Sequence, residues 1–497
     1  METEMEIELA AMNGEGRAAR RNSTLLAMHD LFPPANVVRS GFLNSPFPVA
    51  RDGSPIPLMP GIIVPSANSE EDPAPRSDVQ DLEAGATGGG VPKKRLRKVM
   101  VLIMATIVEA LLWGFVFSFG LFQNQYAAEG VFVAREVEIS MIFIAAVGFM
   151  YGSGAVFEVL FTRFPVVLKV CSRCGLPVAA IGLFLASRST EAWQFILTQG
   201  LFYGIGAAMQ YYSAYSHISD WYSDNKGFAF GMMLAGSGIG GVVIPLIIGP
   251  ILKNQGSTKA LSVWAIVLIL PTPVNWFYLK PRNWNSAPAS PQPLDWSFLK
   301  SKVFWVYQGA NIIQSAGYFL PGIYVATFAQ ALGLSAWEGI SLTAILNICG
   351  SFSSLAIGKL SDIRDVPNIV IASMAAQSVS VLLVWGLADN MAHLSVFVII
   401  YGLVAGGFTS IYSGMAREIR RDCPNMSDTW MMGILSSGRG IGPILCSITT
   451  LTLFSSNPED TIKEGYGSPY EGFVLFSGTM ALLGVAVVSL AKWKRWI

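Results

Sequence analysis

The chain has 497 residues, of which 52% are hydrophobic and only 13% charged, with 33 Lys and Arg against 33 Asp and Glu. A soluble globular chain carries about a quarter of charged residues, so this composition excludes an ordinary water-soluble protein and predicts an all-α protein of the lipid bilayer. The balanced charge gives no sign of a nucleic-acid partner.

The chain begins with a polar segment, residues 1–92, that is rich in Pro, Ser, Gly and acidic residues and has no helical apolar period. Such a segment cannot bury enough apolar surface to offset the entropy of ordering, so we expect a disordered cytoplasmic tail. Its start, METEMEIELA, lacks the basic and apolar regions of a cleavable signal peptide. The first membrane span is therefore expected to direct the chain to the membrane.

After Met100, apolar runs long enough to cross about 30 Å of hydrocarbon recur twelve times. They predict transmembrane helices near 100–122, 139–161, 167–187, 192–214, 227–251, 259–279, 303–329, 337–358, 368–388, 393–416, 428–453 and 471–491. The predicted domains are an N-terminal six-helix bundle at 93–280, a cytoplasmic linker at 281–302 and a C-terminal six-helix bundle at 303–497.

Basic residues test this number of spans, because they gather on the cytoplasmic side of membrane proteins. Every second connection is basic, including KKRLRK before the first span and the segments 280–302, 417–421 and 492–495, whereas the alternate connections hold few Lys or Arg. The pattern predicts that both termini are cytoplasmic. The span lengths fit the plasma membrane, with the vacuolar membrane as the alternative.

An internal repeat relates the two halves. Gly200, Leu201 and Gly204 recur 202 residues later as Gly402, Leu403 and Gly406, and the same shift aligns AGSGIG at 235–240 with SGRGIG at 437–442. One shift that serves several places predicts two copies of six spans in the same orientation.

The repeated glycine runs predict close helix contacts, because small residues one turn apart let transmembrane backbones approach each other. The residues concerned, in spans five and eleven, are Gly231, Ala235, Gly236, Gly240, Gly438, Gly440 and Gly442. We expect these spans to rock against the opposite half. The alternative is that the glycines only permit tight static packing.

Four segments carry a family resemblance: WYSDNKGFAFGMMLAGSGIGG from Trp221, GLFQNQY after span one, LTQGLFYGIG in span four and GRGIG in span eleven. Residues 100–497 resemble the fungal monocarboxylate-transporter-like branch of the major facilitator superfamily. The resemblance implies twelve spans in two halves, a central cavity and alternating access. Many fungal members move carboxylates, vitamins or secondary metabolites.

Departures from that branch concern charged residues. The acidic motif before span one is replaced by PKKRLRKVM, and Ser353 and Ser354 stand about where the proton-linked carriers place an arginine. The inner-loop signature of the superfamily is partly present and implies a latch of the inner face, or else plain interfacial charges; its residues are Gly358, Lys359, Asp362 and Arg364.

Two charged residues fall in mid-membrane, where charge is costly and usually functional. Glu109 lies nine residues into span one and Arg439 eleven into span eleven, about 14 and 17 Å deep at 1.5 Å per residue. Arg439 is the candidate for binding an anionic group, or it pairs with Glu109 or caps backbone carbonyls. Glu109 is the candidate for the coupling proton, with a structural hydrogen bond as the alternative.

Polar residues at helical spacing mark the remaining candidates for solute binding. Span seven has Gln308, Asn311, Gln314 and Tyr318 on neighbouring parts of one face, and Asn311 is the repeat equivalent of Glu109. Because lipid rejects such a face, we expect a water-filled cavity lined by spans one, four, seven and ten. Spans four and ten add Gln199, Gln210, Tyr211, Tyr401 and Tyr412. Each of these could instead bond helix to helix.

The motifs of an enzyme are missing from the sequence. The three His are far apart, Cys171 and Cys174 have no second ligand pair, and GSGIGG lies inside a span rather than in a strand–helix unit. We therefore expect no catalysis, no metal and no cofactor, and a chain that acts as a monomer.

The sequence predicts a secondary active transporter that moves a small organic solute, with a carboxylate-bearing metabolite as the first candidate and a proton as the candidate coupling ion. One alternative is an efflux pump for a larger amphipathic secondary metabolite, favoured by the missing carrier motifs and the many aromatic residues. A second alternative is a membrane sensor that signals through the tail without net flux.

Overall fold

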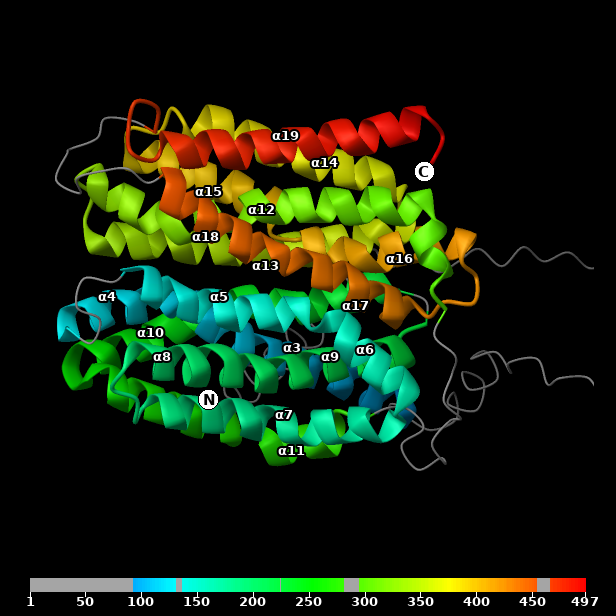
Figure 1. Cartoon of the computed structure of the whole chain (residues 1–497), viewed down its shortest axis with the longest axis horizontal. Coiled ribbons are helices and arrows are strands. Elements are labelled where there is room, and N and C mark those ends of the chain that lie inside the picture. The colour runs from blue at the N-terminus through cyan, green and yellow to red at the C-terminus, as the bar shows by residue number, and fades with distance from the viewer. Residues whose placement is uncertain (1–92, 131–135, 224, 281–294, 454–464) are drawn as a thin grey trace, which may run out of the picture. The chain divides into compact units, whose positions relative to one another are not determined.

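The structure is a computed structural model that describes residues 93–130, 136–223, 225–280, 295–453 and 465–497, and within these ranges every regular element is a helix (Figure 1). The predicted tail, 1–92, and most of the predicted linker, 281–302, lie outside the described residues. The domain boundaries drawn there stay predictions.

The first half of the described chain runs from α3 to α11. Its elements are α3 (Lys93–Phe117), α4 (Phe119–Glu129), α5 (Glu136–Gly152), α6 (Gly154–Arg163), α7 (Pro165–Ala186), α8 (Ala192–Phe195), the π-helix η1 (Ile196–Phe202), α9 (Tyr203–Trp221), α10 (Lys226–Ile269) and α11 (Thr272–Tyr278). A short 3₁₀ helix, η2 (Ser297–Lys300), precedes the second half.

The second half lies beside the first with its helices roughly parallel to them (Figure 1). Its elements are α12 (Lys302–Ala331), α13 (Ala336–Ile363), α14 (Val366–Val379), the π-helix η3 (Ser380–Trp385), α15 (Met391–Ala405), the 3₁₀ helix η4 (Phe408–Ile411), α16 (Tyr412–Asp422), α17 (Asp428–Arg439), α18 (Ile441–Leu453) and α19 (Glu471–Trp493).

The twelve predicted spans are helical where the structure describes them. Nine of the described stretches are long and apolar enough to cross a membrane, and one of these, Lys226–Tyr278, contains two predicted spans. The two predicted spans outside the nine are 192–214, helical in α8, η1 and α9, and 428–453, helical in α17 and α18. The all-helical, twelve-span prediction is confirmed.

Gly256 separates α10 into the two spans that the sequence predicted. Its backbone is non-helical, with φ 82° and ψ 174°, a conformation that glycine tolerates. Gly114 of α3 contacts Gly240 in the first arm, and the neighbouring Phe115 stacks on Trp264 in the second at 6.3 Å between ring centroids. The second arm therefore runs back along α3.

The 202-residue repeat is visible in how the glycines pack. A Cβ at Gly236 of α10 would clash with the backbone oxygen of Thr106 in α3, and a Cβ at Gly438 of α17 would clash with the side chain of Gln308 in α12. Gly236 and Gly438 are 202 residues apart, and so are Thr106 and Gln308. Gly240 and Gly442 likewise contact α3 and α12.

Other glycines of the same runs face the opposite half. A Cβ at Gly231 would clash with the backbone oxygen of Ser354 in α13, and a Cβ at Gly440 would lie 2.6 Å from the backbone nitrogen of Gly152 in α5. The carbonyl of Ala235 accepts a hydrogen bond from Ser351 Oγ of α13 at 2.9 Å. The predicted glycines thus fall into two groups, one that contacts helices of the same half and one that contacts the opposite half. Successive glycines can do this because they lie on different faces of one helix.

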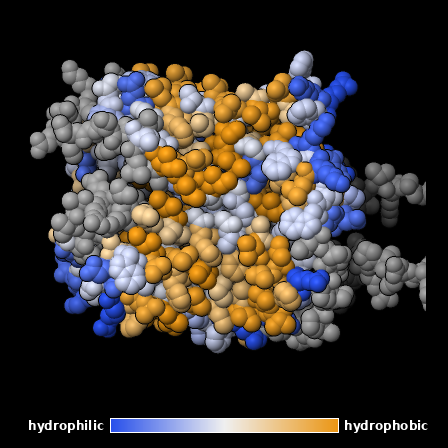
Figure 2. All heavy atoms as spheres, viewed as in Figure 1, coloured by the Kyte–Doolittle hydropathy of each residue, from blue (hydrophilic) through white to orange (hydrophobic). Residues whose placement is uncertain are grey.

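The surface carries the apolar side chains expected of a protein in lipid. Figure 2 shows them gathered across the middle of the visible face, with hydrophilic residues toward its two edges. Leu270, Phe352 and Trp193 are 69%, 62% and 60% exposed. Such a continuous apolar surface is unfavourable in water and favourable in a bilayer.

Candidate functional site

Arg439, the last residue of α17, lies at the centre of the candidate site. Its side chain is 2% exposed, and its Nη1 donates a hydrogen bond to Gln314 Oε1 of α12 at 2.7 Å. Gly438 allows α17 to approach α12, and Gly440 allows it to approach α5 of the other half. The glycines therefore place a cation where the two halves meet.

Four aromatic rings surround the guanidinium, and we call them the aromatic cage. The distances from the guanidinium carbon to the ring centroids are 4.6 Å for Tyr318, 5.7 Å for Tyr151, 5.7 Å for Phe319 and 5.9 Å for Phe408. Ring faces attract a cation and partly replace the water that it has lost. Tyr151 belongs to α5 in the first half, so the cage joins both halves.

No carboxylate of the described chain neutralises Arg439. Glu109 does not approach within ion-pair distance, which excludes the predicted Arg439–Glu109 pair in this conformation, and Nε of Arg439 makes no hydrogen bond with the described residues. Arginine stays protonated at any depth, and a buried cation without a counter-ion is unfavourable. The arrangement can therefore stabilise a negatively charged group at its centre.

The polar residues on one face of α12 make two kinds of contact; these residues, the polar row, are Gln308, Asn311, Gln314 and Tyr318. Asn311 Nδ2 donates to Leu435 O at 2.7 Å and Gln308 Nε2 donates to Ile434 O at 3.2 Å, so these two residues bind α12 to α17. Gln314 and Tyr318, further along the helix, contact Arg439. The structure thus brings only part of the predicted row to the cation.

Hydrogen bonds link the row to α14 and α16. Gln314 Nε2 donates to Gln377 Oε1 at 3.0 Å, and the hydroxyl of Tyr412 donates to Asn311 Oδ1 at 2.7 Å. Gln377 Nε2 and Gln308 Oε1 are buried without a hydrogen-bond partner among the described residues. Buried polar atoms are normally paired, so these atoms are candidates for contact with a ligand or water.

Glu109 lies in the first half among aromatic residues. It is 1% exposed, and its Oε2 has no hydrogen-bond partner in the described chain. It is close enough to Tyr151 and Tyr211 to act on both electrostatically, and Arg439 acts on Tyr151 in the same way. Tyr151 is thus within electrostatic reach of both the acid and the cation.

The predicted water-filled cavity is not open around these residues. Asn311 and Gln314 are 0% exposed, and their amides are bonded to neighbouring helices. A solute that touches them must displace these internal hydrogen bonds or bind after the halves have moved. The structure therefore shows the site closed around Arg439.

Gln210 and Gln199, two predicted site residues of span four, have no described contact with Arg439. Gln210 contacts Asn275, with 3.4 Å between Nε2 and Oδ1, and packs against Gly175 of α7, whereas the next residue, Tyr211, faces Trp113 of α3 with 5.9 Å between ring centroids. Consecutive helical residues point about 100° apart, which explains the difference. Gln210 thus serves as a bond between helices of the first half.

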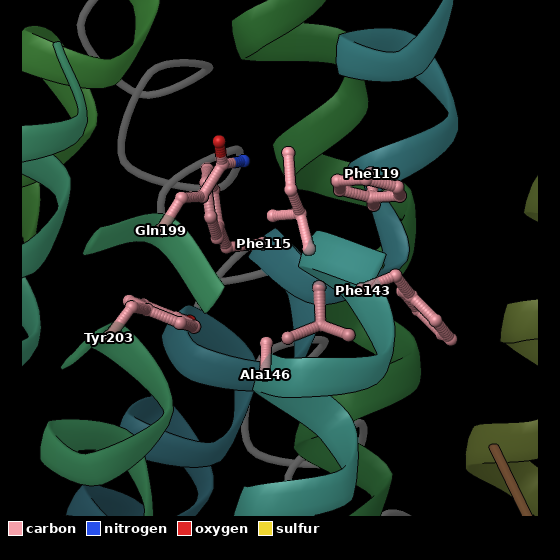
Figure 3. A pocket seen from close by; sticks show the side chains of 8 residues that line it. Phe115, Phe119, Phe143, Ala146, Gln199 and Tyr203 are labelled. Carbon is pink, nitrogen blue, oxygen red and sulfur yellow. The ribbon is translucent and has the colours of Figure 1, made fainter. Parts of the chain in front are cut away.

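Gln199 lines a small pocket between α3, α4, α5 and the span-four helix (Figure 3). Its Oε1 accepts a hydrogen bond from the hydroxyl of Tyr126 at 2.5 Å. Phe115, Phe119 and Phe143 form much of the pocket wall. Gln199 has no contact with the Arg439 cluster among the described interactions.

The predicted latch lies at the end of the bundle where α10 begins, which we call the Lys226 end. Asp362 of α13 accepts hydrogen bonds from the backbone N–H groups of Gly227 and Phe228, each at 2.9 Å. Its carboxylate caps the start of α10, where unpaired N–H groups and the helix dipole favour negative charge. Lys359 Nζ donates to Asn225 Oδ1 at 3.2 Å, but the side chain of Arg364 is exposed and takes part in no hydrogen bond or ion pair with the described residues.

A second contact at the Lys226 end was missed by sequence reasoning. Lys226 Nζ lies 2.6 Å from Asp428 Oδ2, and Arg420 Nη1 lies 2.7 Å from Asp428 Oδ1. Lys226 and Asp428 start α10 and α17, and they are 202 residues apart. Opposite charges at equivalent repeat positions were the signal that could have revealed this pair.

Tyr151, Tyr212 and Ser436 were also missed. The Tyr212 hydroxyl lies 2.8 Å from Ser436 Oγ of α17, which connects the halves next to the cage. Neither charge nor polar spacing distinguishes these residues in the sequence. Only the packing of α5 and α9 against α17 shows their place.

The comparisons with known proteins agree with this arrangement. The family model of the Major Facilitator Superfamily matches residues 102–422. The MFS transporter asaE of Aspergillus flavus is 27% identical over 435 residues, which cover 87% of this chain and 93% of the relative. The Fujikurins efflux protein of Gibberella fujikuroi is 25% identical over 409 residues, or 82% of this chain and 84% of the relative.

A further relative, the Agnestins efflux protein AgnL12 of Paecilomyces divaricatus, is 24% identical over 430 residues, or 86% of this chain and 95% of the relative. The matches extend over both halves, and they indicate no enzymatic family. Together with the helical spans, they show that the chain belongs to the major facilitator superfamily and is a multi-pass integral membrane transporter.

Proposed function

We propose that the protein exports an organic anion of secondary metabolism by exposing one central site to each side of the membrane in turn. The observation that carries this proposal is the buried guanidinium of Arg439, which meets both halves and has no counter-ion among the described residues. The direction rests on the relatives, two of which are named efflux proteins.

The chemistry of Arg439 favours a carboxylate or a related planar anion. A guanidinium presents parallel N–H groups that match the two oxygens of a carboxylate, and its charge is constant over the physiological pH range. Binding of an anion would offset the cost of the buried cation, so the site gains most from a solute that carries negative charge. The cage can contact the apolar body of the same solute.

The finer family assignment is part of the proposal. We infer that the chain belongs to the monocarboxylate-transporter-like branch, which the four motifs resemble. We also infer that its buried arginine comes from another helix than the arginine of the proton-linked carriers. Ser353 Oγ accepts a hydrogen bond from the backbone N–H of Gly407 at 3.0 Å, next to the break between α15 and η4. Ser353 thus supports the backbone, and Arg439 of α17 supplies the charge that α13 lacks.

The proposed orientation places the Lys226 end in the cytoplasm. Basic residues gather at this end, as the positive-inside rule requires, and include Lys226, Lys359, Arg417 and Arg420. The contacts of Asp362 and Asp428 close this end in the structure. Opening of the Lys226 end would admit the solute from the cytoplasm, and we propose the plasma membrane as the site of export.

Glu109 is the proposed proton-coupling residue. It is buried, acts electrostatically on Tyr151 as Arg439 does, and has an oxygen without a hydrogen-bond partner in the described chain. Glu109→Gln keeps the shape and removes the titration, so pH-driven accumulation in proteoliposomes should be lost while solute counterflow continues. Unchanged proton dependence in this variant would exclude the role.

A metabolite comparison in a deletion strain tests the proposed function. The strain should retain an anionic metabolite, and the wild-type gene should restore its export, whereas Arg439→Gln should not. Arg188→Gln is the matched control, because Arg188 is an exposed arginine remote from the site, over the ring of Phe184. Retention of only neutral or cationic metabolites, or full restoration by Arg439→Gln, would contradict the proposal.

A further inference from the structure

The arrangement of the aromatic cage narrows the class of anion that the site can take. Its rings come from three elements in two halves: Tyr151 from α5, Tyr318 and Phe319 from α12, and Phe408 from η4. All four centroids lie within 5.9 Å of the guanidinium carbon. The cation lies over each of these rings, so a ligand that bonds an N–H group at the edge of the guanidinium meets ring faces beside it.

That edge has an available donor. Nη1 of Arg439 is bonded to Gln314, and Tyr151 and Tyr412 also hydrogen-bond to the guanidinium, whereas the buried Nε has no hydrogen-bond partner among the described residues. A carboxylate that accepts two parallel N–H bonds from a guanidinium lies close to the guanidinium plane. The anionic group is therefore expected to enter the cage edge-on and in the plane of Arg439.

A carboxylate bound in this way fixes a plane, and the rest of the ligand extends from that plane past the ring faces. Atoms conjugated with the carboxylate stay in that plane, whereas a saturated ring or a branched carbon places atoms above and below it. Atoms in the plane can stack on a ring face over their whole area, whereas atoms above and below the plane hold the ligand away from that face. The geometry thus favours flat acids over bulky ones.

Further aromatic residues extend the stacking surface beyond the cage. Tyr401 stacks on Tyr318 with 6.3 Å between centroids and an interplanar angle of 19°, and Trp113 lies 4.6 Å from Tyr151. Tyr318 is only partly buried, unlike the other three cage residues. A flat ligand that is longer than the cage can therefore continue stacking at Tyr318.

We propose that the site is selective for flat, conjugated organic anions, such as aromatic carboxylates, over saturated acids of the same size. This inference rests on the proposed function, because it assumes that Arg439 binds the solute. The competing explanation is that the rings only stabilise the arginine and take no part in solute recognition.

The two explanations differ for a pair of acids with one carbon skeleton. Naphthoate is flat, decahydronaphthoate is saturated, and both carry one negative charge at neutral pH. The saturated acid exposes more apolar surface, so hydrophobic burial alone would favour it. Stacking on the cage should reverse this order and give naphthoate about three- to tenfold tighter binding.

The experiment is isothermal titration calorimetry of both acids on the full-length purified protein and on variants. Phe408→Leu keeps an apolar side chain and removes one ring of the cage, so the affinity ratio of the two acids should fall toward one. Phe143→Leu is the matched control, because Phe143 packs against Phe119 outside the cage. The ratio within one variant does not depend on the fraction of folded protein.

The outcomes distinguish failure of the preference for flat anions from failure of the anion site at Arg439. Equal binding of the two acids, tighter binding of decahydronaphthoate, or an unchanged ratio in Phe408→Leu would overturn the preference for flat anions while leaving the anion site intact. If neither acid binds, or if Arg439→Gln binds both as the wild type does, the anion site itself is contradicted.

Discussion

Two faces of α10 use the same residue type for different purposes. Gly236 and Gly240 bring α10 against α3 of its own half, whereas Gly231 and Gly238 bring it against α13 of the other half. The face toward α13 receives hydrogen bonds from Ser351 and Asn347 to the α10 backbone, whereas the face toward α3 receives one, from Thr106. Water can replace such bonds when helices separate, so the α13 face is suited to opening and the α3 face to staying closed.

Substitution of Gly240 is expected to have the largest effect, because its interface must persist in every state. A Cβ there would clash with the backbone oxygen of Ala110, which belongs to a helix of the same half. Gly240→Ala should destabilise the fold by about 3 kcal/mol or more. The measurement is the thermal unfolding temperature of the purified protein together with its yield.

Gly309 of α12 provides the matched control, because a Cβ there would meet no atom within 4 Å. Alanine is a better helix former than glycine, so Gly309→Ala should be neutral or stabilise the fold by up to about 1 kcal/mol. Comparable losses in the two variants would mean that close packing against α3 is not what Gly240 provides.

Gly231→Ala should disturb conformation more than folding. The added methyl would clash with Ser354 O across the two halves, and separation of the halves relieves this clash. The protein should fold but shift its equilibrium toward an open Lys226 end, by about tenfold for each 1.4 kcal/mol of strain. Faster maleimide labelling of a cysteine introduced at Thr429 would report this shift, and unchanged labelling of a folded variant would contradict it.

Asp428→Ala should open the same end by a smaller amount. The substitution removes the ion pairs with Lys226 and Arg420, whose side chains are 23% and 44% exposed. Partly exposed pairs contribute about 1 kcal/mol or less, and salt screens them. The effect on labelling at Thr429 should shrink as ionic strength rises, whereas the effect of Gly231→Ala should not change with salt.

Glu129 gives the smallest predicted effect, at the opposite end of the first half. Burial tends to raise the pKa of its carboxyl, but hydrogen bonds from Ser257 and Gln125 outweigh burial and hold the pKa below its ordinary value. The carboxylate thus stabilises the turn at Gly256 at neutral pH, and this stability is lost as pH falls through the lowered pKa.

Glu129→Gln should therefore lower the unfolding temperature slightly at pH 7, by the equivalent of less than about 1 kcal/mol because the residue is exposed. The difference from the wild type should shrink as pH falls below the ordinary carboxyl pKa of about 4.3 and vanish below the lowered pKa. A difference that is constant with pH would show that the hydrogen bonds do not depend on the charge.

Periodicity and the repeat predicted the fold well. Hydropathy predicted the twelve spans, and the glycine pattern indicated that α10 and α17 each pack closely against neighbouring helices. The 202-residue shift would also have revealed the Lys226–Asp428 pair, had opposite charges been compared at equivalent positions. These features depend on residue spacing and on the internal repeat, both of which can be recognised in the sequence alone.

The site could be predicted only in part. Arg439 and Gln314 were found because polar residues in mid-membrane are conspicuous, but Gln210 and Tyr211 could not be separated, although adjacent residues face different neighbours. Tyr151 was missed altogether. Its role arises from contact between the two halves, which no pattern within one helix records.

The most direct test of the account is whether binding at Arg439 moves the two halves. Spin labels at Ser223→Cys and Arg364→Cys, in a Cys174→Ser background, would report the distance between exposed positions of the two halves at the Lys226 end. We predict that naphthoate changes the distance distribution of the wild type and leaves that of Arg439→Gln unchanged. A distance distribution that is the same with and without the acid in the wild type, or that changes equally in Arg439→Gln, would contradict the account.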